Sequence, residues 1–278
     1  MSHAFRQVDV FSSDPLGGNP VAVVHDADDL SDDRMAAFAR WTNLSETTFL
    51  LRPTEPGADY RLRIFTPGGE LPFAGHPTLG SAHAWLEAGG VARGERLVQE
   101  CGVGLVEVDR ADGRLAFRAP PLLRGGPVEE ADLAPVVAAL GLAPDQVVDA
   151  QWCDNGPGWL GIRLHDAAAV LAVHPRSGAL GQMVGLVGLH PVGSETAVEV
   201  RALCTADLGI VEDPVTGSLN AAIAQWLIAD GTLPPSYVAS QGAAVGRTGR
   251  IHVQRDAGEA IWVGGHTRTT ICGTVDLS

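Results

Sequence analysis

Hydrophobic and polar positions alternate with a period of two over many short stretches of the chain, which predicts a protein rich in β-strands. The alternation is clearest over residues 5–11, and the apolar run 20–25 follows a Gly-Gly-Asn turn. A longer apolar stretch, residues 158–173, also resembles strand structure. The other predicted strands cover residues 46–51, 60–65, 97–100, 104–109, 114–119, 260–263 and 270–275.

Two further stretches carry almost no charge around a whole helical circumference, which predicts two buried helices. The first covers residues 77–88, begins with Pro77 and ends before a pair of glycines. Proline is favoured at a first helical position and glycine after the last one. The second helix covers residues 218–229, begins near Ser218 and ends before an Asp-Gly pair.

Two more helices are expected nearer the surface. Ser31 can cap a helix, and the acidic residues Asp32 and Asp33 suit its positive end. Residues 131–140 also have a helical pattern. Helices and strands together predict an α+β protein.

The two buried helices belong to an internal repeat. Residues 60–88 and 198–229 each contain a strand, a Gly/Pro-rich turn and a small-residue helix that ends in Trp-Leu. His76 and Asp213 occupy comparable places before the two helices, whose N-termini are suited to bind an anionic ligand. A buried helix wrapped by strands in each copy predicts two similar lobes. An ordinary core helix in a single domain is the alternative.

The best linker is the Pro- and Gly-rich segment 119–127. It predicts a first lobe over residues 1–120, joined by a C-terminal strand at about 265–278, and a second lobe over 121–264. The length of 278 residues suits two domains of about 140 residues each.

Composition narrows the class of protein. A formal net charge of −14 argues against nucleic-acid binding, which needs clustered Lys and Arg. The N-terminus lacks the apolar core of a signal peptide, and no stretch approaches the roughly 20 apolar residues of a membrane span. The four cysteines have no C-x-x-C pair and no zinc or iron–sulfur spacing. We therefore expect a cytoplasmic protein with reduced, mostly buried thiols and no metal.

Two residues of the first repeat are candidates for proton transfer. Glu46 lies between the apolar residues Leu44 and Phe49, a setting that suits a general acid or base near neutral pH. His76 lies at or just before a helix start, where the positive helix end lowers the pKa of imidazole and favours its neutral form. The alternatives are a surface glutamate at a strand start and a structural helix cap.

In the second repeat, Asp213 and the Thr216–Ser218 turn read as a helix cap joined to an anion-binding turn. Capping alone would also explain an aspartate and a serine there. The symmetry with His76 favours a functional role. Asn19 lies in a sharp Gly-Gly-Asn-Pro turn, where it needs no function but can also face a ligand.

Five segments, in order and spread over essentially the whole chain, carry a shared pattern: Asp9–Phe11, Gly18–Val23, Leu44–Thr47, Phe73–Thr78 and Glu212–Ser218. Together they resemble the phenazine-biosynthesis PhzF-like family. That family shares the diaminopimelate-epimerase fold, so the resemblance implies two pseudo-symmetric lobes, each a strand barrel around a central helix, with the site in the cleft between them. The epimerase branch places a cysteine at each helix start, which this sequence lacks.

The resemblance implies a cofactor-independent isomerase that moves a proton between carbons of a small carboxylate-bearing metabolite. Glu46 would transfer the proton, with His76 and Asp213 as its catalytic partners. A dihydro-hydroxyanthranilate-type substrate, no cofactor and a homodimer follow from the family. The implied substrate-binding residues are Asn19, Ser45, Gly75, Thr216, Gly217 and Ser218.

Two other functions stay open on the sequence. One is an epimerase or racemase that acts at an α-carbon. The other is a small-molecule binding protein in which the site survives without turnover. All three predict a small-molecule partner and neither a nucleic acid nor a membrane.

Overall fold

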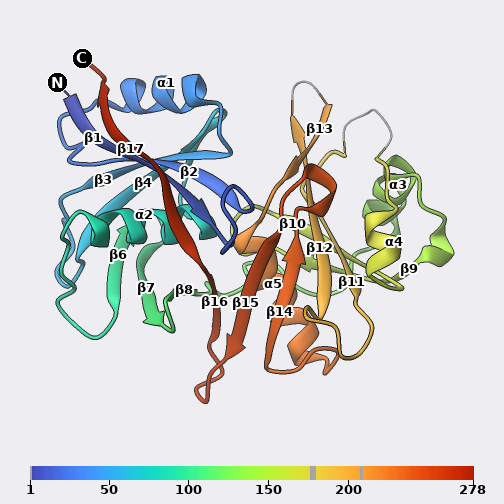
Figure 1. Ribbon diagram of the computed structural model, residues 1–278. Helices are drawn as coiled ribbons and strands as arrows, with labels where there is room; N and C mark the ends of the chain where they lie inside the picture. Colours follow the sequence, from blue (N-terminus) through green and yellow to red (C-terminus); the bar gives the residue numbers. More distant parts are fainter. Residues whose placement is uncertain (1, 176–179, 207–208) are drawn as a thin grey trace. The chain divides into compact units, whose positions relative to one another are not determined.

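The computed structural model describes residues 2–175, 180–206 and 209–278, and their contacts divide into two units (Figure 1). Unit 1 comprises Met1–Arg118 and Gly264–Ser278, and unit 2 comprises Ala119–Val263. Each unit combines one sheet with a few helices, so the chain is α+β as the sequence predicts.

Unit 1 is a sheet in which the first and last strands of the chain are neighbours (Figure 1). The strands pair in the order β17–β1–β2–β3–β4–β6–β7–β8, and β5 pairs with β4. The β2–β3 and β4–β6 pairs are parallel. The bounds are β1 (Ser2–Val10), β2 (Asn19–Val24), β3 (Glu46–Leu51), β4 (Tyr60–Thr66), β5 (Gly69–Leu71), β6 (Leu97–Cys101), β7 (Gly104–Ala111), β8 (Arg114–Arg118) and β17 (Thr267–Asp276).

Helices α1 (Asp32–Thr42) and α2 (Gly75–Glu87) cover opposite faces of this sheet. Phe49 packs in the cluster under α1, whereas its neighbour Thr48 contacts Ser81 of α2, and successive strand residues point to opposite faces. Ser31 caps α1, because its hydroxyl accepts the Arg34 N–H at 3.3 Å. The predicted cap of α1 is therefore confirmed.

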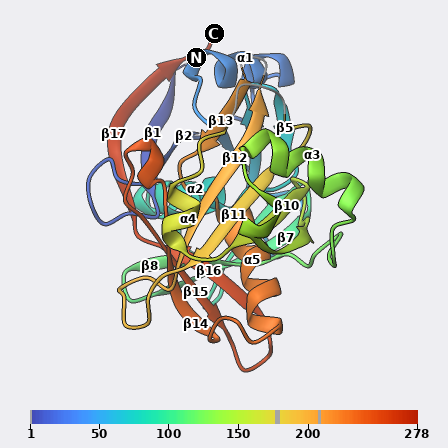
Figure 2. The ribbon, with the colours of Figure 1, turned by 90° about the vertical axis from the view of Figure 1, so that its right-hand side faces the viewer.

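Unit 2 is a sheet in the order β9–β10–β11–β12–β14–β15, with β13 on β12. The β10–β11 and β12–β14 pairs are parallel. Figure 2 shows α3 and α4 beside β10–β12. The bounds are β9 (Val147–Cys153), β10 (Trp159–Leu164), β11 (Val184–Leu189), β12 (Val198–Ala206), β13 (Gly209–Asp213), β14 (Ser236–Gln241), β15 (Gly249–Arg255), β16 (Ile261–Gly265), α3 (Glu130–Leu140), α4 (Ala167–Leu171), α5 (Gly217–Ala229) and the short 3-10 helices Pro144–Gln146 and Ala243–Val245.

The two units repeat one order of elements, which supports the duplication seen in the sequence. In unit 1, β1 and β2 are antiparallel, α1 crosses over to β3, β3 and β4 are antiparallel, and β5 and α2 lead to β6 parallel to β4. In unit 2, β9, β10, α4, β11, β12, β13, α5 and β14 follow the same scheme. The central helices α2 and α5 are buried, as their lack of charge predicts.

Three local predictions are wrong. Helix α2 begins at Gly75 rather than Pro77, which is its third residue. Proline still fits there, because the first-turn N–H groups have no intrahelical partner. The stretch 158–173 contains β10 and then the helix α4, which Asp166 caps by accepting the Ala169 N–H at 2.8 Å. The thiols are not mostly buried: Cys153 is buried, Cys101 and Cys204 are half-buried, and Cys272 is exposed on β17.

Membrane insertion through a helix has no support in the described part of the chain. None of the helices there combines the length and apolar character needed to cross a bilayer.

Candidate active site

Three of the predicted site residues come together on the α2 face of the unit 1 sheet. Asn19 is the first residue of β2, Glu46 is the first residue of β3, and His76 is the second residue of α2. Glu46 lies two residues before Thr48, whose hydroxyl contacts α2, so alternation directs the Glu46 side chain toward the same helix. Packing of α2 on the β2–β3 pair thus gathers residues that are distant in sequence.

The contacts of His76 define the proton positions in this group. The Asn19 side-chain nitrogen lies 3.3 Å from His76 Nδ1, and His76 Nε2 lies 3.2 Å from Glu46 Oε2. An amide nitrogen only donates, so Nδ1 accepts and a neutral ring carries its proton on Nε2. His76 Nε2 and Glu46 Oε2 lie at ion-pair distance, but the angle between these two atoms does not meet hydrogen-bond geometry. A carboxylate beside a neutral imidazole still suits proton transfer.

Burial keeps the imidazole neutral. His76 is 2% exposed, and this burial lowers its pKa to about 3. The sequence predicts the same direction from the positive helix end, but burial of the ring is the cause in the structure. Glu46 is more accessible, with 14% of its side chain exposed. The carboxylate is therefore the member of this group that a ligand can reach.

A strained turn fixes Asn19. The Asp9 carboxylate accepts the Gly18 N–H at 3.1 Å, and the buried Phe11 has a φ of 71°. A Cβ on Gly18 would lie 2.1 Å from the Val10 carbonyl oxygen, so only glycine fits. Unusual backbone of this kind is retained where a side chain must be placed accurately. Asn19 itself is fully buried.

Ser45 and Gly75 adjoin this group. Ser45 is half-buried and immediately precedes Glu46, and Gly75 is the first residue of α2. The first N–H groups of a helix have no intrahelical partner, so Gly75 and His76 can present N–H groups to an anion.

A second group lies in unit 2 around the start of α5. The N-cap residue is Thr216, so the prediction that Asp213 caps this helix is wrong. Asp213 instead ends β13, and its Oδ2 accepts the Thr216 hydroxyl at 2.5 Å. Gly217 and Ser218 are the first two helical residues. All four predicted residues of this repeat therefore belong to one strand–turn–helix segment.

Four buried side chains that the sequence analysis missed support this second group. Trp159 Nε1 donates to the Ser218 hydroxyl oxygen at 3.1 Å, and Asn155 donates to the Ser218 carbonyl oxygen at 2.9 Å. Asn220 donates to the Thr216 carbonyl oxygen at 2.9 Å, and Gln241 accepts the Thr216 N–H at 3.0 Å. Asn155 comes from a turn and the other three from apolar core segments, and no local signal marked them.

The residue of unit 2 that is equivalent to His76 differs from the one that the sequence predicts. His76 is the second residue of α2, so its equivalent is Ser218, the second residue of α5, rather than Asp213. Asn19 and Trp159 each begin the matching strand, and each bonds that helix residue. Asp213 lies before α5, because it is the last residue of β13 and a turn of three residues separates β13 from the helix.

The same comparison leaves Glu46 without an acidic equivalent. Glu46 pairs with Val21, two residues after Asn19, and Gly185 pairs with Gly161, two residues after Trp159. A Cβ on Gly185 would lie 2.3 Å from Leu219 Cδ1, so the helix fills the space of a side chain. The two units therefore share a fold but not an acid–base residue at this position.

The burial of His76 leads to a testable prediction for acid stability. Between about pH 6.5 and pH 4 the unfolded chain binds a proton at His76 that the folded chain does not, so stability falls as the pH falls. We expect His76→Gln to remove up to about 1.4 kcal/mol per pH unit of this dependence. Urea unfolding at several pH values measures it. Exposed His165→Gln is the control, and an unchanged slope in His76→Gln would contradict the prediction.

Comparisons with known proteins agree on one family. A family model described as phenazine biosynthesis-like protein matches residues 8–274. The chain is 38% identical over 266 residues to trans-2,3-dihydro-3-hydroxyanthranilate isomerase of Pseudomonas aeruginosa, covering 93% of each chain. It is 38% identical over 295 residues to antisense-enhancing sequence 1 of Schizosaccharomyces pombe, covering 98% of each. The solved structure of a predicted epimerase of Pseudomonas aeruginosa matches with a TM-score of 0.81 at 27% identity, covering 98% of this chain and 99% of that one.

Proposed function

Because the chain belongs to the PhzC-PhzF family of phenazine biosynthesis-like proteins and is an isomerase, we propose that it moves a proton between two carbon atoms of a small carboxylate-bearing metabolite. A dihydro-hydroxyanthranilate is the substrate class we propose first, since the Pseudomonas aeruginosa relative is named for that substrate.

The contact between Glu46 and His76 carries the proposal. In the first step the Glu46 carboxylate takes a proton from a substrate carbon, and the electron pair of that C–H bond shifts into the substrate π system. In the second step the carboxylic acid returns the proton to another carbon, so neither oxidant nor reductant is needed. The neutral His76 ring, whose Nε2 lies 3.2 Å from Glu46 Oε2, is proposed to donate its Nε2–H to the carboxylate during the reaction and so to orient it for both steps.

The position equivalent to Glu46 supports a mechanism in which one carboxylate both removes and returns the proton. A racemase that inverts a stereocentre commonly uses two bases, one on each side of the carbon. In unit 2 the equivalent position is Gly185, and the equivalent of His76 is Ser218. Neither residue is a strong base, which favours return of the proton by the carboxylate that removed it.

The strand–turn–helix segment of unit 2 is proposed to bind the acidic group of the substrate. Gly217 and Ser218 present N–H groups at the start of α5, where the helix end is positive. Ser218 Oγ accepts from Trp159 Nε1, so its own O–H can donate to a ligand. Asp213 would assist proton transfer, as the family resemblance implies.

The experiment that tests this function is incubation in D₂O with trans-2,3-dihydro-3-hydroxyanthranilate and related cyclic amino acids, followed by NMR. We expect isomerisation, with deuterium at the receiving carbon to the extent that the Glu46 carboxylic acid exchanges its proton with D₂O before it returns one. Deuterium at a stereocentre that also inverts would instead identify an epimerase. Tight binding without exchange for any compound would identify a non-catalytic binding protein and contradict the proposal.

A further inference from the structure

Gln241, the last residue of β14, makes more contacts with the segment before α5 than its position in a strand requires. It is 1% exposed. Its Oε1 accepts the Thr216 N–H at 3.0 Å and Asn220 Nδ2 at 2.8 Å. Its Nε2 donates to Thr216 Oγ1 at 2.9 Å and to the Asp213 carbonyl oxygen at 3.2 Å. Both donors and both acceptor positions of the amide are used.

These contacts fix the direction of each hydrogen bond. The Thr216 N–H only donates and the Asp213 carbonyl oxygen only accepts, so the orientation of the Gln241 amide is set by backbone groups. The amide nitrogen must therefore donate to Thr216 Oγ1. A hydroxyl has a single hydrogen, and that of Thr216 then points at Asp213 Oδ2, 2.5 Å away.

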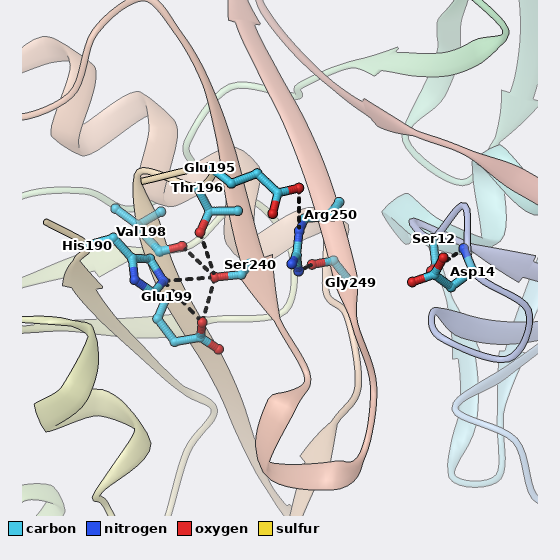
Figure 3. Close-up of polar contacts among 10 residues, drawn as sticks. All are labelled: Ser12, Asp14, His190, Glu195, Thr196, Val198, Glu199, Ser240, Gly249 and Arg250. Atoms are coloured by element: carbon cyan, nitrogen blue, oxygen red, sulfur yellow. Dashed lines mark hydrogen bonds and ion pairs between the residues drawn. The ribbon is translucent and has the colours of Figure 1, made fainter. Parts of the chain in front are cut away.

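The strand end that carries Gln241 is held from its other face as well. Adjacent strand residues point to opposite faces, so Ser240 faces away from Gln241. Figure 3 shows Ser240 among polar side chains: its hydroxyl donates to Glu199 Oε2 at 2.5 Å and lies 3.1 Å from His190 Nε2. Thr196 Oγ1 lies 3.3 Å from the same hydroxyl. Hydrogen bonds on both faces therefore hold this end of β14.

In unit 1 a strand glutamine makes a contact with the central helix that is related to that of Gln241. There Gln99 of β6 donates to Thr78, the fourth residue of α2, at 3.0 Å, as Gln241 contacts Asn220, the fourth residue of α5. Bonding to the fourth helix residue thus serves the shared fold. The additional bonds of Gln241 to Thr216 and Asp213 belong to the candidate site of unit 2.

We propose that Gln241 is a positioning residue for the reaction, which acts through the Thr216 hydroxyl to hold the Asp213 carboxylate in one orientation. The inference rests on the proposed function, in which Asp213 assists proton transfer. Gln241 itself contacts no reacting atom in this scheme.

Two variants break the same hydrogen-bond chain at different atoms. Gln241→Glu keeps the two acceptor contacts but removes both donors, and the Thr216 hydroxyl then donates to the introduced carboxylate instead of Asp213. Thr216→Val removes the hydroxyl, whereas Thr216→Ser keeps it. We expect kcat to fall about 10–100-fold in Gln241→Glu, with KM little changed, and by a similar factor in Thr216→Val. Thr216→Ser keeps the hydroxyl and should lose less activity than Thr216→Val.

The double variant and a matched control separate positioning from stability. The double variant should lose no more activity than the worse single one, because both act through one contact. Gln225→Glu on α5 is the control, since Gln225 bonds the Pro120 carbonyl oxygen and should leave kcat unchanged. A lower melting temperature with unchanged kcat in Gln241→Glu and Thr216→Val would overturn the inference.

A crystal structure of Thr216→Val gives a readout that does not depend on the substrate. We expect the Asp213 carboxylate to rotate away from its present orientation, and an unmoved carboxylate would overturn the inference.

Glu46→Gln distinguishes a failure of the proposed function from a failure of the role of Gln241. If Glu46→Gln keeps full activity, the proposed function fails. If it loses activity while the Gln241 and Thr216 variants keep theirs, only the role of Gln241 fails.

Discussion

Glu46→Gln is expected to lower turnover by about 10²–10⁴-fold while the chain stays folded and still binds its substrate. The amide has nearly the shape of the carboxylate, so it can occupy the same place beside His76. It cannot take up a proton near neutral pH, so the step from carbon is lost. Substrate conversion and deuterium uptake measured by NMR test this, with ligand binding measured in parallel.

The control for this variant is Glu55→Gln, which removes one carboxylate of unit 1 at an exposed position. Its turnover should equal that of the parent chain. Full activity in Glu46→Gln would exclude Glu46 as the proton-transfer residue. Loss of binding together with activity would show that the glutamate serves the ligand rather than the proton.

Arg201→Met is expected to lower the free energy of unfolding by about 3–5 kcal/mol. Arg201 is 5% exposed and bonds Glu212 through two nitrogens, at 3.1 and 2.8 Å. It also donates to the carbonyl oxygens of Val170 and Val173 at the end of α4. The substitution leaves the Glu212 carboxylate, 8% exposed, without its counter-charge. Urea unfolding measures the loss.

Two comparisons isolate the buried charge as the cause. Arg201→Met with Glu212→Met should be less destabilised than Arg201→Met alone, because no unpaired charge remains. Arg255→Met breaks the more exposed pair with Glu259, whose distance is 3.2 Å, and should cost less than about 1 kcal/mol. Equal losses in the single and double variants would contradict the argument.

The second prediction concerns a neighbour of the candidate site of unit 2, since Glu212 immediately precedes Asp213. The Arg201 pair fixes the end of the β12–β13 hairpin, in which Ala202 pairs with Asp213. Gln241 then fixes the turn that follows. The site residues of unit 2 are thus held by a buried ion pair and a saturated amide rather than by their own conformational preferences.

Local signals explain which elements were predictable from the sequence. Strand β3 covers Glu46–Leu51, and α1 begins after its cap Ser31, both as expected, because alternation and capping act within a few residues. Helix α4 was missed because its five residues form one short turn in an apolar run. Helix α2 began two residues early, since burial of its first turn outweighed the preference of proline for a first position.

Some residues of the candidate site were predictable from local motifs, and others were not. The motifs around Asn19, Glu46 and His76 are visible in the sequence. Their resemblance to motifs of a known family implies the role of each residue. No motif marked Gln241 or Trp159, since a glutamine or tryptophan at a strand end is an ordinary core residue. The expected match between His76 and Asp213 is wrong, because Asp213 ends β13 and three residues separate it from α5, whereas His76 lies within α2.

By itself, the sequence determined the strand-rich α+β class, the internal repeat, the burial of the two central helices and the identity of the candidate residues. These follow from periodicity, charge and short-range chemistry along the chain. Only the tertiary structure decided that His76 lies 3.2 Å from Glu46, that Ser218 is its equivalent, and that Gln241 orients the Thr216 hydroxyl. Such contacts join residues that are distant in the chain, so they depend on strand register and helix packing, which no local pattern encodes.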